Sequence, residues 1–280
     1  MTYSNFRASQ KSFKSKDGVI KYIDQGQGEV ILLLHGVPTS SWLYRHMIQQ
    51  LSNNYRVIAP DMLGFGNSES PIGYEVYSEE NHALRLLNLM RSLNIKNWIH
   101  VMHDAGGLWT WELIKRNLNC INKLIVLNTI IYKQGFKPPI RFKKGLVAKV
   151  IMWTYKNGVT TNMMLKGLFN SGLTDNHLNA LDIEGYKIPL LEGKTRAMYY
   201  FFSQTCNTLP KYNSVLKTLN VPTMVIWGEN DSFLKWEPQK NQVIKDLNIL
   251  AENIHLINAK HFIQEEWPDK INRLILDFLN

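Results

Sequence analysis

Residues 98–107 of the chain read Trp98-Ile99-His100-Val101-Met102-His103-Asp104-Ala105-Gly106-Gly107. The first half is apolar enough for a buried strand, and the second half combines a polar pair with a small residue and two glycines. A helical pattern follows from residue 108 to residue 114. A strand, a sharp turn and a helix in this order form a nucleophile elbow, which holds one side chain above the edge of a sheet. Here that side chain is Asp104, where the common motif has serine.

An aspartate at this position determines the chemistry that the turn could perform. A carboxylate is ionised at neutral pH, so it can attack an electrophilic carbon and form an ester without a base to activate it. A separate base must then help water to hydrolyse the ester. The alternative is an ordinary turn in which Asp104 caps the N-terminus of the helix.

The surrounding sequence alternates apolar strands with helical patterns, which predicts an α/β fold with a mostly parallel central sheet flanked by helices. A broken alternation over Ser12–Ile23 predicts a hairpin. Strand-like apolar runs occur at Val30–Leu34, Tyr55–Ala59, Trp98–His103, Lys123–Leu127, Val221–Trp227 and Asn253–Ile257. Two helices are expected at Trp42–Leu51 and Glu79–Leu93, a glycine-rich surface loop at Met62–Ser68, and a closing helix at Ile263–Leu279.

The alternation stops between Ile131 and Leu219, where helical patterns occur without a convincing core strand. We therefore expect a core made of residues 1–130 and 220–280 and a helical insertion made of residues 131–219. Because ligands bind at the carboxyl ends of the strands in such sheets, the insertion is expected to cover those ends as a cap.

The composition is that of a soluble globular protein, with 45% hydrophobic and 20% charged residues in a chain of 280. The two cysteines, Cys120 and Cys206, do not form a disulfide framework, and the polar N-terminus lacks the pattern of a secretory signal. These features predict a cytoplasmic protein. No apolar run is long enough to span a membrane, and neither metal-ligand spacings nor a phosphate-binding glycine loop occur.

The net charge of +9 is unevenly distributed, since no Asp or Glu occurs between Leu113 and Thr174. A basic surface of this kind could attract nucleic acid, anionic lipid or an acidic partner. The alternative is a solvated basic face, which we favour because no nucleic-acid-binding motif accompanies the charge. We therefore expect no nucleic-acid partner.

Two polar residues after later strands could complete a hydrolytic triad with Asp104, in the chain order nucleophile, acid, base. Asp231 follows one strand and His261 follows the last. His261 would take a proton from water, and Asp231 would orient its ring and stabilise the imidazolium. Glu229 is the nearest rival acid. The backbone N–H groups of Ala105 and Val37 would form the oxyanion hole.

The other histidines are expected to have no catalytic role. His103, beside Asp104, is expected to point to the opposite side of its strand and to pack structurally. The rest are expected to be surface or strand residues: His46, His82, His100, His177 and His255.

Four segments together resemble the haloalkane dehalogenases. The stretch from His35 to Arg45 is similar to HGxPTSSxLxR, and the loop from Asp61 to Ser68 matches D-x-x-G-x-G-x-S. His103-Asp104 fits the HD-x-G elbow, which epoxide hydrolases of the α/β-hydrolase fold share. The segment from His261 to Pro268 is similar to HFxQExxP. The resemblance implies an α/β-hydrolase fold with a helical cap, no metal or organic cofactor, and a small apolar substrate. Asn128 stands where some members carry their acid, which favours Asp231 as the acid.

The sequence departs from this family at the groups that bind the departing halide. Ala105 replaces the tryptophan that usually follows the nucleophile, and Val37 replaces an asparagine. Trp109 and Trp153 could supply an indole N–H instead, although for Trp109 we favour a core residue packed against the sheet. Epoxide hydrolases protonate the opened oxygen with cap tyrosines, for which the candidates are Tyr155, Tyr199 and Tyr200.

The sequence thus predicts a hydrolase that opens a carbon–halogen or similar activated bond through an Asp104 ester. The alternatives are an epoxide hydrolase and a binding protein that retained the triad without turnover. The oligomeric state is left open.

Overall fold

The computed structural model describes residues 1–175 and 178–280. Eight strands form one sheet in the order β1-β2-β4-β3-β5-β6-β7-β8. The strands are β1 (Lys11–Ser15), β2 (Gly18–Gln25), β3 (Val30–Leu34), β4 (Arg56–Pro60), β5 (Trp98–Asp104), β6 (Ile121–Thr129), β7 (Thr223–Gly228) and β8 (Ile254–Ile257). The β1–β2 and β2–β4 pairs are antiparallel, and all the other pairs are parallel. The predicted α/β fold with a mostly parallel sheet is confirmed.

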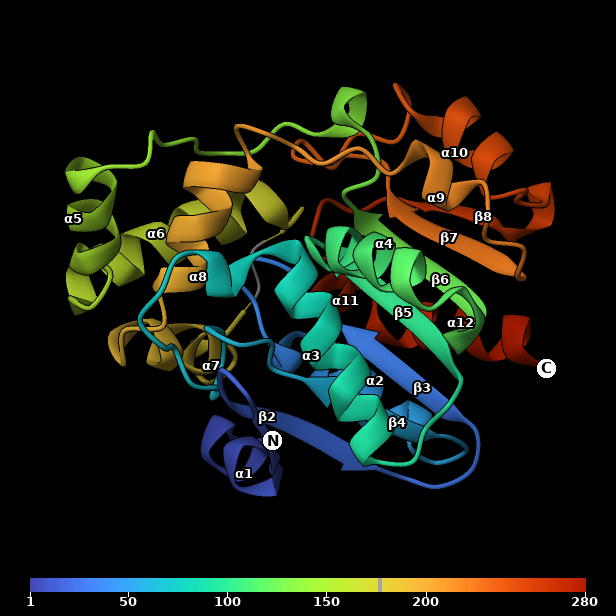
Figure 1. Cartoon of the computed structure of the whole chain (residues 1–280), viewed down its shortest axis with the longest axis horizontal. Coiled ribbons are helices and arrows are strands. Elements are labelled where there is room, and N and C mark those ends of the chain that lie inside the picture. The colour runs from blue at the N-terminus through green and yellow to red at the C-terminus, as the bar shows by residue number, and fades with distance from the viewer. Residues whose placement is uncertain (176–177) are drawn as a thin grey trace.

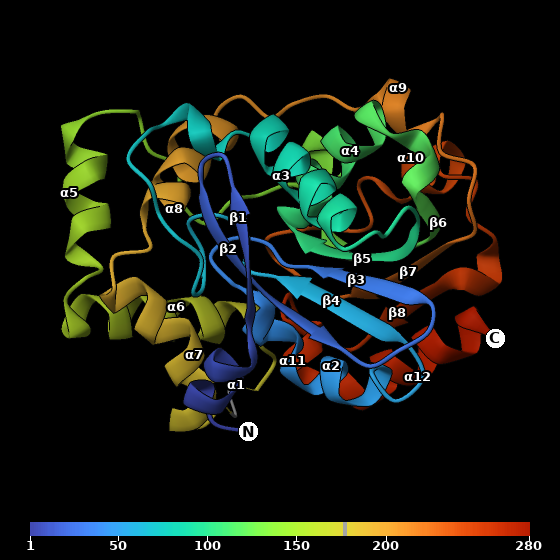
Figure 2. The same cartoon turned by 60° about the horizontal axis from the view of Figure 1, so that its bottom comes forward.

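Helices cover both faces of this sheet, as Figures 1 and 2 show. The pair α3 (Glu79–Ser92) and α4 (Gly106–Arg116) lies on one face, and α2 (Arg45–Leu51) and α12 (Pro268–Leu279) lie on the other. Since both faces are covered, the central strands β5 and β7 are buried along their whole length. The smaller helices of the core are α1 (Tyr3–Ser9), α10 (Lys240–Asp246) and α11 (Ile263–Glu266).

The segment of residues 130–222, between β6 and β7, adds no strand to the sheet within its described residues. Its helices are α5 (Leu146–Thr154), α6 (Gly158–Gly172), α7 (Ala180–Leu191), α8 (Arg196–Tyr200) and α9 (Asn213–Leu216). Figures 1 and 2 place α5 to α8 together at one end of the molecule, with α5 at its outer edge. The division of the chain into a core and a cap stays a prediction.

The loop Met62–Ser68 differs from the surface loop that its glycines predict, because it is largely buried. The cause is Asp61, whose carboxylate accepts hydrogen bonds from the backbone N–H groups of Ser41 and Asn67. Ser68 then donates to the Asp61 carbonyl and accepts from the backbone of β2. A buried carboxylate with these partners holds the loop against the core.

Two further expectations are wrong in detail. The closing helix is broken at Trp267, because Pro268 lacks the N–H that would continue α11 and disfavours helical geometry in the residue before it. His82 is neither at the surface nor in a strand, since it lies on α3 with its ring 4.6 Å from that of Trp109. The prediction for His177 lies outside the described residues.

In the part of the chain that the structure describes, no helix is both long and apolar enough to cross a bilayer. The same residues contain no group of three or more potential ligands that could hold a metal ion.

Candidate active site

The turn at the end of β5 places Asp104 in a left-handed backbone conformation, with φ of 51°. This conformation is costly for a residue with a side chain, so its surroundings must hold it there. The Asp104 carbonyl accepts hydrogen bonds from the hydroxyl of Thr129 and the N–H of Ile130. The two following glycines allow α4 to begin against neighbouring strands, since a Cβ on Gly106 would lie 2.7 Å from the His35 carbonyl oxygen.

The Asp104 carboxylate lies between two backbone N–H groups. Val37 N donates to Oδ1 across 2.7 Å, and the N–H of Ala105 also hydrogen-bonds the carboxylate. Gly36 permits this approach, because a Cβ at that position would lie 2.3 Å from Oδ1. Both N–H groups predicted for an oxyanion hole therefore hydrogen-bond the Asp104 carboxylate.

His261 and Asp231 lie beside the other oxygen of Asp104. Nδ1 of His261 is 2.8 Å from Oδ2 of Asp231, and Nε2 is 3.7 Å from Oδ2 of Asp104. A carboxylate only accepts, so this contact places the ring proton on Nδ1 and leaves the Nε2 lone pair facing Asp104. The side chains of Asp231 and His261 are almost fully buried, whereas that of Asp104 is 11% exposed. The structure thus brings the three predicted residues together.

Asn128 holds the acid in place from the end of β6. Its Nδ2 donates to Oδ2 of Asp231 across 2.7 Å, and its Oδ1 accepts from the N–H of Gly228. Oδ1 of Asp231 accepts from the N–H groups of residues 233 and 234. Glu229, the rival acid, is exposed. The amide at position 128 is therefore an orienting partner of the acid.

Burial and neighbouring charges have opposite effects on the pKa values of Asp104 and His261, whose side chains face each other. Burial raises the pKa of Asp104 above its ordinary value, although the charge of His261 and the N–H groups of Ala105 and Val37 act against it. Burial lowers the pKa of His261, but the charge and hydrogen bond of Asp231, together with the charge of Asp104, outweigh it and leave the pKa raised. The ring is thus prepared to hold a proton.

The model of the alpha/beta hydrolase fold family matches residues 29–268. The chain belongs to the α/β-hydrolase fold family. The predictions of this fold and of a hydrolase are thereby confirmed.

Epoxide hydrolases and haloalkane dehalogenases are among the named relatives of this hydrolase. Epoxide hydrolase 3 of Xenopus tropicalis is 27% identical over 95% of this chain and 76% of its own length. Haloalkane dehalogenase 2 of Mycobacterium tuberculosis is 28% identical over 95% of this chain and 93% of its own length. A mutant epoxide hydrolase of Bacillus megaterium has a similar structure, with a TM-score of 0.73 at 24% identity, covering 96% of this chain and all of that one.

His103 packs directly against the candidate base of the hydrolase. Its ring centroid is 4.6 Å from that of His261, and its Nε2 is 3.0 Å from the His261 carbonyl oxygen. Burial and then the nearby His261 lower the pKa of His103 well below its ordinary value. The packing role that we expected for His103 therefore includes a contact with the ring of His261.

The two tryptophans proposed as halide donors occupy different environments. Trp109 is buried in a stack with His82 and His35, and its indole N–H has no hydrogen-bond partner among the described residues. Trp153 is 67% exposed and lies on α5 at the outer edge of the molecule, where it lines a surface groove. The position of Trp153 argues against the donor role that the sequence suggested for it.

The three candidate tyrosines lie in or beside α5 and α8. Tyr199 lines the same groove as Trp153, and its hydroxyl accepts from the N–H of Gly145 across 3.1 Å. The hydroxyls of Tyr155 and Tyr200 have no hydrogen-bond partner in residues 1–175 and 178–280. No described hydrogen bond or ring contact joins any of the three to Asp104 or His261.

Two residues near the site were not found from the sequence. The ring of Phe233 stands edge-on to His261, with 5.3 Å between the ring centroids. Cys206 is buried, and its thiol pKa is raised by burial and then by the charge of Asp104. It follows a π-helical turn at Phe201–Thr205, a feature frequent at functional sites, but no sequence signal identifies that turn.

Proposed function

We propose that this hydrolase opens the carbon–halogen bond, or a similarly activated bond, of a small apolar substrate through an alkyl ester on Asp104. One observation carries the proposal: Oδ1 of Asp104 accepts the N–H of Val37 while Oδ2 faces His261. Oδ2 attacks the substrate carbon, and the bond to the leaving group breaks with its electron pair departing on that group.

Water completes the reaction at the carbonyl carbon of the ester. His261 accepts a proton from the water through Nε2, and the imidazolium is stabilised by Asp231. The tetrahedral intermediate carries its negative charge on the oxygen that Val37 and Ala105 hydrogen-bond. When the intermediate collapses, the alcohol leaves with the proton that His261 took from water. The carboxylic acid formed at position 104 releases the remaining proton of that water to solvent, which restores the carboxylate.

The leaving group divides the proposal into two candidates. A carbon–halogen bond fits the named dehalogenase relative and the four matching sequence segments. An epoxide fits the named epoxide hydrolase relative and the free hydroxyls of Tyr155 and Tyr200, either of which could donate to an opened oxygen. In both candidates we take the segment of residues 130–222 as the cap over the substrate. A binding protein without turnover is disfavoured by the assembled triad.

Labelled water tests the ester directly. In a single turnover in H₂¹⁸O, the product should contain unlabelled oxygen and the peptide carrying Asp104 should gain ¹⁸O. His261→Gln should form the ester but not hydrolyse it, so intact mass should show an adduct on that peptide. A panel of bromoalkanes, epoxides, β-lactones and aryl esters, read by halide, diol and acid release, identifies the leaving group. Label found in the first product, or an adduct on another peptide, would contradict the proposal.

A further inference from the structure

Helix α5 exposes an apolar face to solvent. Four large apolar side chains on it are between 51% and 77% exposed: Leu146, Val147, Val150 and Trp153. At 100° per residue they fall within an arc of about 120°. The opposite side of the helix packs inward through Ala148 and Met152. We call the four exposed residues the α5 patch.

Exposed apolar residues are common singly, but a contiguous group of them marks an interaction surface. Figures 1 and 2 agree that α5 is at the outer edge of the molecule, so the patch is unobstructed by the rest of the chain. The next helix, α6, adds two more exposed apolar residues near its beginning, Val159 and Met163.

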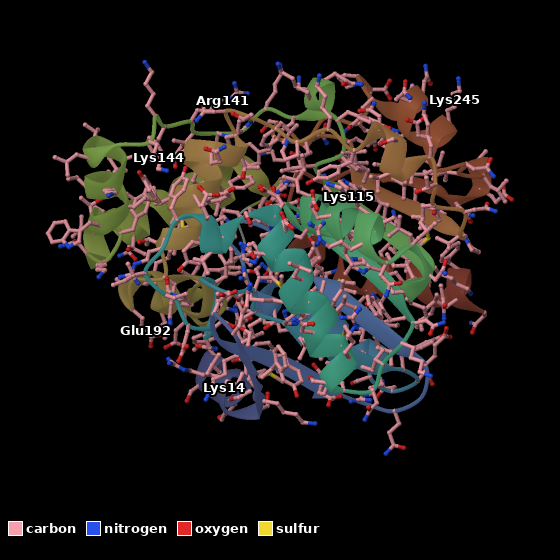
Figure 3. All side chains as sticks on the ribbon, viewed as in Figure 1. Lys14, Lys115, Arg141, Lys144, Glu192 and Lys245 are labelled. Carbon is pink, nitrogen blue, oxygen red and sulfur yellow. The ribbon has the colours of Figure 1, made fainter. Side chains whose placement is uncertain are left out.

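Cations surround the patch without acidic neighbours. The exposed cations that flank it in the sequence are Arg141, Lys143, Lys144, Lys149 and Lys156. None of the five has a carboxylate within ion-pair distance among the residues that the structure describes. By contrast, Lys115 and Arg116, from the same acid-free stretch, pair with Glu112. Figure 3 shows Arg141 and Lys144 on the loop that leads to α5, far from Lys115 on α4.

A groove of about 600 Å³ beside the patch has the same mixed character. Its lining combines apolar and aromatic side chains, including Trp153, with the cations Lys144, Lys149, Lys156 and Arg196. The ammonium of Lys144 lies over the Tyr74 ring, 3.7 Å from its centroid. Long lysine stems let the other ammonium groups reach outward while an apolar face enters a less polar medium. Tryptophan and lysine on one helix face suit the boundary between lipid headgroups and acyl chains.

The charge around the α5 patch indicates which kind of partner could bind there. A second copy of the chain would bring two uncompensated cationic surfaces together, which costs free energy. A nucleic acid would satisfy the cations but would leave the apolar side chains without an apolar partner. An anionic bilayer satisfies both, because its headgroups attract the cations and its interior accepts the apolar face.

We propose that the α5 patch docks this hydrolase on an anionic phospholipid surface. Leu146, Val147, Val150 and Trp153 enter the boundary below the headgroups, and the flanking lysines contact the lipid phosphates. The inference does not depend on the reaction at Asp104, which lies in a different part of the molecule.

Vesicle flotation tests the proposal with the full chain. The protein should float with vesicles of phosphatidylcholine mixed with phosphatidylglycerol, not with phosphatidylcholine alone, and high salt should release it. Lys149→Ala should lower the partition coefficient about fivefold, the loss of one cation near an anionic surface. Val150→Glu should abolish flotation, and Asp104→Asn should leave it unchanged.

Leu250→Glu is the matched control, because Leu250 is 58% exposed between α10 and β8, at the other end of the molecule. Thermal unfolding checks that each variant remains folded. Absence of flotation with the anionic vesicles would overturn the proposal, as would equal losses in Val150→Glu and Leu250→Glu. Self-association that Val150→Glu removes, without flotation of the parent protein, would assign the patch to a second copy instead.

Discussion

Gly36→Ala is expected to impair the reaction by displacing the Asp104 carboxylate. Gly36 does not have a positive φ, so alanine can adopt its backbone conformation and the only new element is a Cβ. That Cβ would lie 2.3 Å from Oδ1 of Asp104 and 2.7 Å from the nitrogen of Ala105. The substitution therefore acts on the proposed oxyanion hole, and because the Ala105 nitrogen is a backbone atom, the turn after β5 must shift as well.

The size of the effect follows from these distances. A real Cβ essentially never approaches another heavy atom within 3.0 Å, so Oδ1 must move by ~0.7 Å, the difference between 3.0 and 2.3 Å. The move lengthens or misaligns the 2.7 Å hydrogen bond from Val37 N. Loss of one oxyanion donor costs ~10²–10³ in rate, and a 1 Å misplacement costs ~10². We expect kcat to fall by ~10³, with an overpacking cost of about 1–3 kcal/mol in the free energy of unfolding.

The measurement follows the ester as well as the product. The hole stabilises the tetrahedral intermediate of ester hydrolysis, so Gly36→Ala should slow hydrolysis more than alkylation and the Asp104 ester should accumulate in intact-mass spectra. Gly158→Ala is the control, because a Cβ there meets nothing within 4 Å. A kcat for Gly36→Ala within about threefold of the parent value would refute the assignment of this hole.

Three further outcomes are expected. Asp231→Asn should lower kcat by ~10³–10⁴. The proposed mechanism requires a neutral His261, so activity should be lost as pH falls through the pKa of this ring. Because the charge of Asp231 raises that pKa, its removal should move the acid limb of the pH–rate profile to lower pH. Glu265→Gln should lower the free energy of unfolding by about 3 kcal/mol, because it leaves the buried guanidinium of Arg45 without its closest carboxylate. Glu192→Gln, at an exposed ion pair, should change the free energy of unfolding by less than about 1 kcal/mol, and chemical denaturation measures both. Chloroalkanes should release halide ~10²-fold more slowly than the matching bromoalkanes, because Ala105 and Val37 supply no side-chain N–H to the departing chloride.

The sheet and the residues at its strand ends could be predicted because both depend on local pattern and chain order. Fully buried parallel strands such as β5 and β7 must be apolar throughout, so their sequences reveal them. The carboxyl ends of parallel strands meet at one edge, which brings Asp104, Asp231 and His261 together once the strands are known. Their distances confirm that arrangement, and their roles in the reaction remain proposals.

Residues placed by long-range contacts could not be predicted in the same way. The loop at Met62–Ser68 has the composition of a surface loop, and only the contacts of Asp61 with distant residues explain its burial. A helical pattern gives the apolar face of α5 but not whether that face meets the core or solvent, so the sequence offers Trp153 as a halide donor although the residue is exposed. Cys206 follows a π-helical turn that leaves no periodic signal in the sequence.

The segment of residues 130–222 also has a structural connection to the candidate base. The carbonyl of Gly172, at the end of α6, accepts the N–H groups of His261 and Phe262 across 2.9 and 3.0 Å. Lys260 Nζ donates to the Leu173 carbonyl across 2.9 Å, so the loop that carries the base caps this helix end with two donors and a cation. Gly172 has no room for a side chain, since a Cβ there would lie 2.6 Å from the Phe262 ring. The helices that we take as the cap therefore also hold the loop that carries the proposed base, and we expect a change in this segment to move the His261 ring relative to Asp104.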